Sequence, residues 1–489
     1  PELPGNFAVD APSGWDGTLD ASYVIPLARS GSRAEQAHGL LPRSDDSHAA
    51  GFSSNTLIDV IQGARRLEAE RTIRFVGPPD ATIATGWGGL STGAQEVRFD
   101  HAIDNVPLVF GHLSAVSTSD AGGLRFEIAQ FGPGPDGTGH ALRIAETLVP
   151  LYGRNSGRPY GEPVRLFLTP LTRGGTHTDH GCIVGFQADD LDAENVPEFI
   201  RIVAHELFHN WLGGCLRPPD DESLVWFHEG FTEYFTTWHM TASSLASREW
   251  FAERLASMDA VARSSSAFGR VTFAEPSVRW RDGDGPNETL AYRGGAMLAF
   301  FADVELRRQG GPGLMKLVAD LLRDGDRPLT LVAIREWMGS NGLAEFYASY
   351  VAKPASLPDL DSALREIGFE ATESEASLTY LGIEIEGSDS IGKIAALDPD
   401  GPAARAGFKI GDQIVGCAPS RMNPPRVGAS VATPYRFGLN RLASGAKVGT
   451  LDVVRDGREL TLSIEPRPIP GGLRTAYRRG GEALDRFFQ

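Results

Sequence analysis

Two histidines and a glutamate stand close together in a pattern that can hold a metal ion. His205, Glu206 and His209 form an H-E-x-x-H sequence. Residues four apart lie on one face of a helix, so the two imidazoles can bind one metal while Glu206 points at what the metal binds. A catalytic zinc takes three protein ligands and keeps a fourth position open. The pattern therefore predicts zinc-assisted chemistry and a third ligand further along the chain.

The residues around this motif predict the helix that it needs. Apolar residues recur at spacings of three and four between positions 200 and 212, which is typical of a helix with one buried face. The signals for its ends are Asn195, Pro197 and Glu198 at the start and Gly213-Gly214 at the stop.

A second helix is expected to carry the third ligand. In the metzincin pattern a glycine and a histidine follow the second histidine by three and six residues, but Leu212 and Cys215 stand there. Glu229 instead follows His209 after nineteen intervening residues, in the sequence W-F-H-E-G-F-T. The acidic residues at 220–222 predict the start of this helix, because a helix N-terminus favours negative charge.

The combined motif resembles a known peptidase family. H-E-x-x-H followed by W-F-x-E-G-F-T-x-Y is similar to the M61 peptidases, the glycyl aminopeptidase family. The resemblance implies one zinc ion per chain held by His205, His209 and Glu229, with Glu206 as general base. It also implies a tyrosine from a later helix, and Tyr292 in the sequence A-Y-R-G-G is the candidate oxyanion donor.

Two further features bear on specificity and positioning. Glu233 lies one turn beyond Glu229, where it either orients a ligand histidine or belongs to a solvated helix face. The family carries a G-G-L-E-H-like loop whose glutamate suits a substrate α-ammonium, but here Thr176 and His177 follow Gly174-Gly175. Aminopeptidase action is the family's default, and endopeptidase action without selection of a free N-terminus stays open as the alternative.

The substrate is expected to bind along a strand near the metal. The M61 resemblance implies a thermolysin-like (gluzincin) fold, in which a mixed sheet packs on the zinc helix and one strand pairs with the extended substrate. We expect residues 182–186 to be that strand. The candidate substrate-binding residues are Gly174, Gly175, His177, Cys182, Ile183 and Val184.

A separate module is expected near the C-terminus. The signature P-A-x-x-A-G-x-x-x-G-D-x-I resembles PDZ domains of the bacterial protease-associated kind. The resemblance implies that an extended peptide adds to an edge strand, here residues 383–386, while backbone N–H groups hold its terminal carboxylate. Leu381, Gly382 and Ile383 are the candidate carboxylate loop. A packing module without a ligand is the alternative.

The fold class expected from these signals is a multidomain α+β protein. Short strand-like runs separated by Gly, Pro, Asp and Ser predict an all-β region at the N-terminus, and helical runs predominate after residue 313. The expected divisions are residues 1–135 (N-terminal β domain), 136–325 (thermolysin-like zinc peptidase domain), 326–376 (helical extension), 377–468 (PDZ domain) and 469–489 (C-terminal tail).

Other patterns do not support competing functions. Residues 89–93 match a nucleophile elbow, but the strand-like residues after them do not make the helix that an elbow requires. Residues 132–137 match G-x-G-x-x-G, but two prolines remove N–H donors that a pyrophosphate needs. His177 and His180 could suggest a second metal site, but two histidines on an irregular loop lack the geometry that a helix enforces, so polar loop residues lining the cleft are the favoured interpretation. A PDZ scaffold with a vestigial zinc site is opposed by the five intact catalytic positions.

Composition limits the partners. The 489 residues carry a net charge of −17, which repels phosphate backbones, so nucleic acid is not expected. The three cysteines give no disulfide framework, and no apolar run reaches the roughly 18 residues of a membrane span. Peptides or proteins are the expected substrates, and a peptide is the expected PDZ ligand. The sequence begins at Pro1 without a signal sequence, and the resemblance to exported M61 proteins favours the periplasm or secretion.

Overall fold

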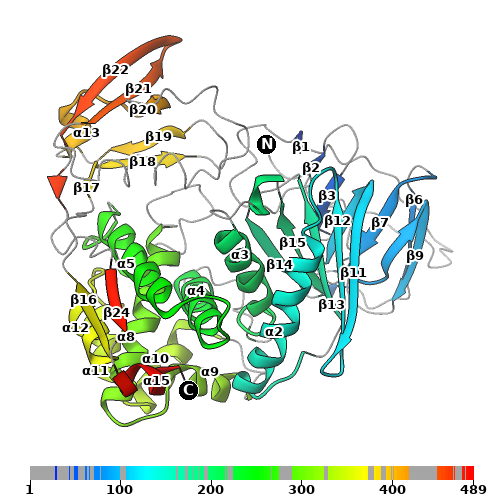
Figure 1. Ribbon diagram of the computed structural model, residues 1–489, viewed down its shortest axis with the longest axis horizontal. Coiled ribbons are helices and arrows are strands. Elements are labelled where there is room, and N and C mark those ends of the chain that lie inside the picture. Colours follow the sequence, from blue (N-terminus) through cyan, green and yellow to red (C-terminus); the bar gives the residue numbers. More distant parts are fainter. Residues whose placement is uncertain are drawn as a thin grey trace.

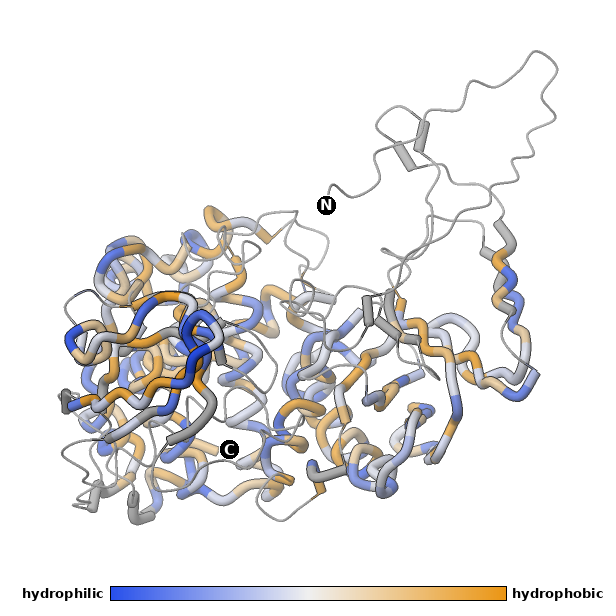
Figure 2. Tube along the Cα trace, turned by 90° about the horizontal axis from the view of Figure 1, so that it is seen from above, coloured by the Kyte–Doolittle hydropathy of each residue, from blue (hydrophilic) through white to orange (hydrophobic). Residues whose placement is uncertain are grey.

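The computed structural model describes most of the chain from residue 71 onward and short strands before it. The described ranges are 28–29, 43–44, 49–52, 61–62, 65–66, 71–76, 79–99, 106–160, 163–170, 174–178, 180–186, 188–191, 196–214, 216, 224–265, 267–274, 289–323, 329–372, 379–386, 392–397, 399, 401–417, 449–465, 467–468, 476–479 and 481–488. Among these residues, no helix combines the length and apolar character that a bilayer crossing needs. Figure 2 shows hydrophobic stretches along the described helices and strands, with hydrophilic ones between them.

The described residues before position 112 form strands, as their short apolar runs predict. The main sheet has the order β1-β2-β3-β10-β7-β8, and two further pairs join β4 to β5 and β6 to β9. The strands are β1 (Ala28–Arg29), β2 (Arg43–Ser44), β3 (Ala49–Phe52), β4 (Ile61–Gln62), β5 (Arg65–Arg66), β6 (Arg71–Val76), β7 (Thr82–Thr85), β8 (Gly89–Thr92), β9 (Ala94–Phe99) and β10 (Pro107–Gly111). Because β8 leads into β9, residues 89–93 do not form a nucleophile elbow.

A five-stranded mixed sheet forms the centre of the molecule (Figure 1). Its order is β11-β12-β13-β15-β14, with β12, β13 and β15 parallel and β14 antiparallel to β15. The strands are β11 (Leu113–Ala121), β12 (Leu124–Phe131), β13 (Val164–Thr169), β14 (Gly175–Thr178) and β15 (Gly181–Gly185). Alternate side chains serve two cores: Cys182 and Val184 pack towards the helices, and Ile183 packs towards residues of the N-terminal strands.

Helices from several parts of the chain pack against the central sheet. The apolar cluster that joins them to the central sheet includes Phe208 and Trp211, both fully buried. The helical segments are α2 (Thr138–Ser156), η1 (Ala188–Leu191), α3 (Val196–Phe208), α4 (Val225–Ala242), α5 (Arg248–Ser264), η4 (Leu290–Gly294), α8 (Gly295–Arg308), α9 (Leu314–Arg323), α10 (Leu331–Ser340), α11 (Ala344–Phe346), η5 (Tyr347–Val351) and α12 (Leu360–Glu366). The chain is therefore of mixed α+β class, as predicted.

A second five-stranded sheet, with the order β18-β19-β20-β21-β22, has its own small apolar core. We call it the C-terminal sheet; Figure 1 shows it in yellow to orange-red, apart from the central sheet. Its elements are β18 (Ile383–Glu386), β19 (Gly392–Leu397), α13 (Pro402–Arg405), β20 (Gln413–Cys417), β21 (Gly449–Arg455) and β22 (Arg458–Ile464).

The chain returns from the C-terminal sheet to the helical region. Strand β17 (Thr379–Tyr380) pairs with β23 (Arg467–Pro468), and β16 (Phe369–Thr372) pairs with β24 (Ala476–Arg479). Helix α15 (Gly481–Phe487) follows, and its last residue, Phe487, packs with the next residue, Phe488, against Phe251 of α5. The C-terminal residues, which we expected to be a tail, thus include a strand paired with β16 and a helix that packs on the helical region.

Candidate active site

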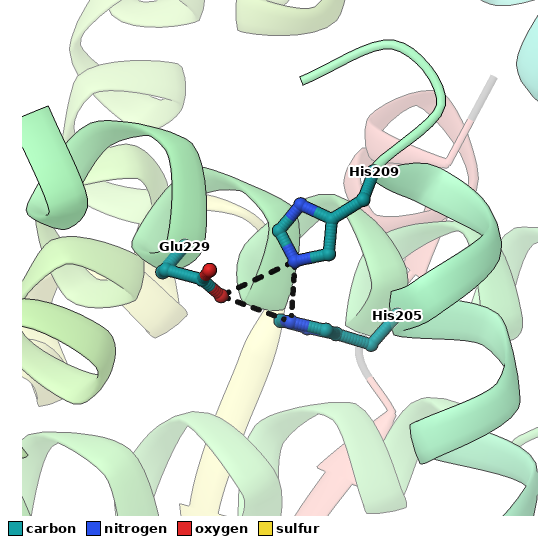
Figure 3. Close-up of side chains that lie close together, drawn as sticks. All are labelled: His205, His209 and Glu229. Atoms are coloured by element: carbon teal, nitrogen blue, oxygen red, sulfur yellow. Dashed lines mark hydrogen bonds and ion pairs between the residues drawn. The ribbon is translucent and has the colours of Figure 1, made fainter. Parts of the chain in front are cut away.

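Three side chains bring their donor atoms together between α3 and α4 (Figure 3). Nε2 of His205 lies 2.9 Å from Nε2 of His209, and each of these nitrogens lies 3.2 Å from Oε2 of Glu229. His205 and His209 are buried, and Glu229 is nearly so. Among the described residues, this is the one group of three such side chains with the spacing of a metal site. It contains the three residues that the sequence pattern predicted as ligands.

The end of α3 fixes the orientation of His209. The regular helix ends at Phe208, four residues before the expected end. Two of the amides that follow bond to carbonyls three residues back instead of four, as Trp211 N does to Phe208 O at 3.0 Å. The carbonyl oxygen of Leu212 then lies 2.8 Å from Nδ1 of His209. A hydrogen bond from Nδ1–H to this carbonyl leaves the lone pair on Nε2, which is the nitrogen that faces the group. The expected N-terminal signal at Asn195 lies outside the described residues.

Glycines allow α4 to approach the segment that carries Tyr292. A side chain at Gly230 would overlap the backbone of Gly295, and a side chain at Gly295 would overlap the carbonyl oxygen of Trp226. Glu229, next to Gly230, is therefore held at a close crossing of α4 with α8. The acidic residues at 220–222 lie outside the described residues.

Glu206 lies in a tight space between α3 and β14. It is buried, and a side chain at Gly175 would overlap it, so Gly175 must be a glycine for the strand to lie this close. Burial raises the pKa of the Glu206 carboxyl above its ordinary value. The structure thus places Glu206 beside the edge strand of the central sheet, one residue from His205.

The edge strand beside the site is β14 and not β15. Strand β15 contains most of the segment 182–186 that we expected to bind the substrate. It pairs with β13 on one side and with β14 on the other, so it has no free edge for a substrate. Cys182, Ile183 and Val184 are buried in the two cores. The expectation for these three residues is therefore corrected. The sheet order, in which β14 precedes β15 but lies outside it, depends on pairing that no local pattern reveals.

His177 lies on β14 near His209. Its ring centroid is 6.4 Å from that of His209, and it follows Gly175 at the spacing that puts both on one face of the strand. Gly174 has φ of +72°, which favours glycine at the start of the strand. Gly175 and His177 thus lie beside Glu206 and His209, and Gly174 directly precedes the strand, whereas His180 belongs to the turn after β14.

Glu233 is at the centre of a buried ion-pair cluster. Nη1 of Arg201 and Nη1 of Arg293 lie 2.7 and 2.6 Å from its Oε1, and Nη2 of Arg254 lies 3.5 Å from its Oε2. Oε1 is also 4.0 Å from Nδ1 of His205. Glu233 thus faces His205 and not solvent. We did not identify the arginines from the sequence, although Arg201, four residues before His205, could have indicated a residue on the same helix face.

The charges of the site depend on burial and on mutual pairing. Burial favours neutral His209, but Glu229 and Glu206 raise its pKa to about 9. Burial acts against ionised Glu229, but His209 and His205 hold its pKa well below the ordinary range. Burial lowers the pKa of His228 to about 4, so this imidazole is neutral at pH 7. Without a metal, His209 is therefore protonated at pH 7 and pairs with the ionised Glu229 carboxylate.

The remaining predicted residues are not members of the group of His205, His209 and Glu229. Tyr292 is half-buried on η4, a π-helical turn that packs on α4. Leu381, Gly382 and Ile383 precede or begin β18 in the C-terminal sheet; the carbonyl oxygen of Leu381 accepts from the Ala403 N–H at 2.9 Å, and Gly382 has φ of +73°.

Comparisons with known proteins define the class. The family model described as M61 glycyl aminopeptidase matches residues 198–292, from the first turn of α3 to Tyr292. An aminopeptidase N family protein from Idiomarina loihiensis has a similar fold, with a TM-score of 0.69 and 17% identity over 92% of this chain and 84% of that chain. An M1 zinc metallopeptidase from Deinococcus radiodurans, bound to a Tyr-Ser-Ala substrate, matches over 59% of this chain and 65% of that chain at 19% identity. Its TM-score of 0.44 is too low to support an argument. No curated protein sequence matches.

The protein is a peptidase. The segment that identifies it as one is the M61-like stretch at 198–292, which contains the group of His205, His209 and Glu229 together with Glu206.

Proposed function

We propose that the chain is a zinc metallopeptidase that hydrolyses peptide bonds, with one zinc per chain held by His205, His209 and Glu229. The observation that carries the proposal is the spacing of the three donor atoms, 2.9 to 3.2 Å. Ligands about 2.0–2.1 Å from a tetrahedral zinc lie about 3.3 Å apart, so this set fits the ion. Two nitrogens and one carboxylate oxygen are also a donor set found in catalytic zinc sites.

The remaining residues supply the proton transfers. When bound, zinc polarises the substrate carbonyl and makes a water more acidic. Glu206 accepts the proton of the attacking water and passes it to the leaving amine, and its raised pKa brings it closer to the working pH. Tyr292 donates its O–H to the oxyanion that develops on the carbonyl oxygen.

We place the substrate along β14. This strand is the last of the central sheet in the described part of the chain, so its outer N–H and C=O groups can pair with an extended peptide. Gly175 leaves room for Glu206, and His177 lies further along the same face. The peptide backbone would then pass directly over the metal-site residues.

An M61-type aminopeptidase is the first candidate activity, and an endopeptidase is the second. The observation that favours the second is His177, an imidazole near His209 where the family loop carries a glutamate. An α-ammonium in a cleft needs a carboxylate partner, because an unpaired buried charge costs several kcal/mol. Glu233 is already paired with three arginines, so its carboxylate does not supply the partner that an α-ammonium needs.

We also propose that residues 377–468 form a PDZ domain that binds a peptide or protein, and we retain the divisions stated above for residues 1–376. Strand β18 lies at one end of the C-terminal sheet, and Leu381 and Gly382 precede it as a carboxylate loop requires. The alternative, a scaffold with a vestigial zinc site, is disfavoured by the converging ligands.

A panel of fluorogenic peptides tests the activity. Each peptide is assayed with a free and an acetylated N-terminus in wild type and in His177→Glu. An aminopeptidase cleaves the free peptide with a much higher kcat/KM, and an endopeptidase cleaves both alike. We expect His177→Glu to raise the ratio of free to acetylated kcat/KM. An unchanged ratio would show that this position does not face the N-terminus.

A further inference from the structure

One oxygen atom joins two helical segments of the site. Oε1 of Glu233, on α4, accepts from Arg201 of α3 at 2.7 Å and from Arg293 of η4 at 2.6 Å. The Glu233 and Arg201 side chains are 3% and 8% exposed, and that of Arg293 is 21% exposed. Hydrogen bonds between buried ions are short and directional, and losing one partner leaves an uncompensated charge. The cluster therefore fixes α3 and η4 relative to α4.

Each arginine stands close to a residue of the proposed mechanism. Arg201 precedes His205 by one helical turn, and Oε1 of Glu233 is 4.0 Å from Nδ1 of His205. Arg293 directly follows Tyr292 in the π-helical turn η4. Such wide turns occur frequently at functional sites, where they redirect side chains. The same carboxylate oxygen thus lies near His205, a proposed metal ligand, and accepts a hydrogen bond from the residue next to Tyr292, the proposed oxyanion donor.

The glycine contact alone does not fix the direction of Tyr292. Gly294 lets η4 approach Phe273, and Gly295 lets α8 approach Trp226 and Gly230. Because glycine has no side chain, neither contact includes a side-chain group from η4 or α8. Smooth van der Waals contact sets the distance between two helices and leaves rotation about the helix axis less constrained. The Arg293–Glu233 hydrogen bond is directional and links the residue next to Tyr292 to α4, so it resists that rotation.

We propose that Arg293 is a positioning residue that, through Glu233, sets where the Tyr292 hydroxyl lies relative to the metal ligands. The inference rests on the proposed zinc peptidase mechanism and adds a residue to it. In this arrangement Arg293 contacts neither substrate nor metal. Its effect on the reaction passes entirely through Tyr292.

A double-mutant cycle on Arg293→Gln and Tyr292→Phe tests the proposal. The Arg293→Gln protein is expected to fold, because Arg201 still pairs with the same oxygen of Glu233. We expect kcat to fall about tenfold with KM within about twofold, since small misplacement of a reacting group is costly. Tyr292→Phe alone should lower kcat about a hundredfold. In the Tyr292→Phe background, Arg293→Gln should cost less than about twofold, because residues that act as a unit are not additive.

Further measurements separate positioning from a structural effect. Zinc content should equal that of wild type in all four proteins of the cycle. The inhibition constant of a phosphinic peptide, which mimics the tetrahedral intermediate, should weaken in the same non-additive way, as a readout independent of turnover. Arg293→Lys should recover part of kcat, and it replaces Arg293→Gln in the cycle if the latter is unfolded. Arg308→Gln, an exposed change on α8 with no contact to Glu233, is the matched control and should not differ from wild type.

Several results would overturn the proposal. These are an equal loss of kcat in both backgrounds, a loss of zinc on Arg293→Gln, or no change of kcat on Arg293→Gln. Full activity of Tyr292→Phe would remove Tyr292 from the mechanism and this inference with it, while leaving the metal site intact. A wild-type protein that binds zinc but cleaves no peptide would instead show that the proposed function itself is wrong.

Discussion

Glu233 and Asp412 are both buried carboxylates held by arginines, but they lie in very different surroundings. Asp412, in the C-terminal sheet, accepts from Nε and Nη2 of Arg455 at 2.6 and 2.7 Å and from the Lys409 N–H at 2.8 Å. These contacts close one turn and one strand pair. Glu233 links α3, α4, α5 and η4 and faces His205, a proposed zinc ligand. We therefore expect the pairs at Glu233 to affect activity and the pair at Asp412 to affect stability alone.

Removal of a metal ligand is expected to have the largest effect in the helical region. In His209→Ala, two donors remain, and a site with two ligands does not retain a catalytic zinc. Peptide hydrolysis should fall to background, and zinc content should fall well below one per chain by elemental analysis. Arg455→Gln, in the C-terminal sheet, should retain full zinc content. Full metal content in His209→Ala would contradict the ligand assignment.

Neutral substitutions of the two carboxylates test the comparison directly. Glu233→Gln should lower zinc affinity or kcat about 10- to 100-fold, because groups that orient metal ligands have effects of this size. Asp412→Asn should change kcat for a short peptide by less than about twofold, within the scatter of substitutions far from a site. Both should lower Tm. Equal effects on kcat, measured on the folded fraction, would show that the location of the ion pair does not matter.

Zinc affinity is expected to depend strongly on pH. The pKa of His209 in the metal-free protein is about 9, so below this pH zinc must displace a proton from the imidazole. The apparent affinity should fall by about tenfold for each pH unit below 9. Calorimetry in buffers of different ionisation enthalpy measures the released proton at pH 7.5. An affinity that is constant between pH 6.5 and 8.5 would contradict this assignment.

The two ion pairs should stabilise the fold over the same pH range. Burial opposes ionisation of both carboxyls, but the arginines hold the pKa of Glu233 well below, and that of Asp412 below, the ordinary values. Their contribution is therefore fully present above about pH 4.5 and is lost as the pH falls through the lowered pKa values. The Tm difference between wild type and Glu233→Gln or Asp412→Asn should shrink in acid. A Tm difference that grows below pH 4 would contradict the assignment of lowered pKa values to these two carboxyls.

The C-terminal helix gives the smallest expected effect on catalysis. Phe487 is 2% exposed and packs on Phe251, with Arg307 over its ring at 4.6 Å. Phe487→Ala should destabilise the helical region by about 3 kcal/mol, as the loss of a buried aromatic ring does. The kcat of the folded protein should stay near that of wild type. An unchanged Tm would show that α15 does not belong to the core of the catalytic region.

The helical part of the site was predictable because its geometry is local. His205 and His209 are four residues apart, and Glu229 is recognised by its own motif, so periodicity and spacing were sufficient. Strand order was not predictable, because β14 becomes the edge only through its pairing with β15. Nor was the cluster at Glu233, whose partner Arg293 is 60 residues away. Convergence of distant segments needs the packed structure, and the burial of α15 is a further instance.

Zinc content and peptide hydrolysis measured together in wild type and Glu206→Gln test the central proposal most directly. The substitution keeps the shape of the side chain and all three proposed ligands but removes the proton acceptor. Both proteins should bind about one zinc per chain, and kcat should fall by about a thousandfold in the variant, within the range for general-base removal. A wild-type protein without zinc, or a Glu206→Gln protein with undiminished kcat, would contradict the zinc peptidase mechanism.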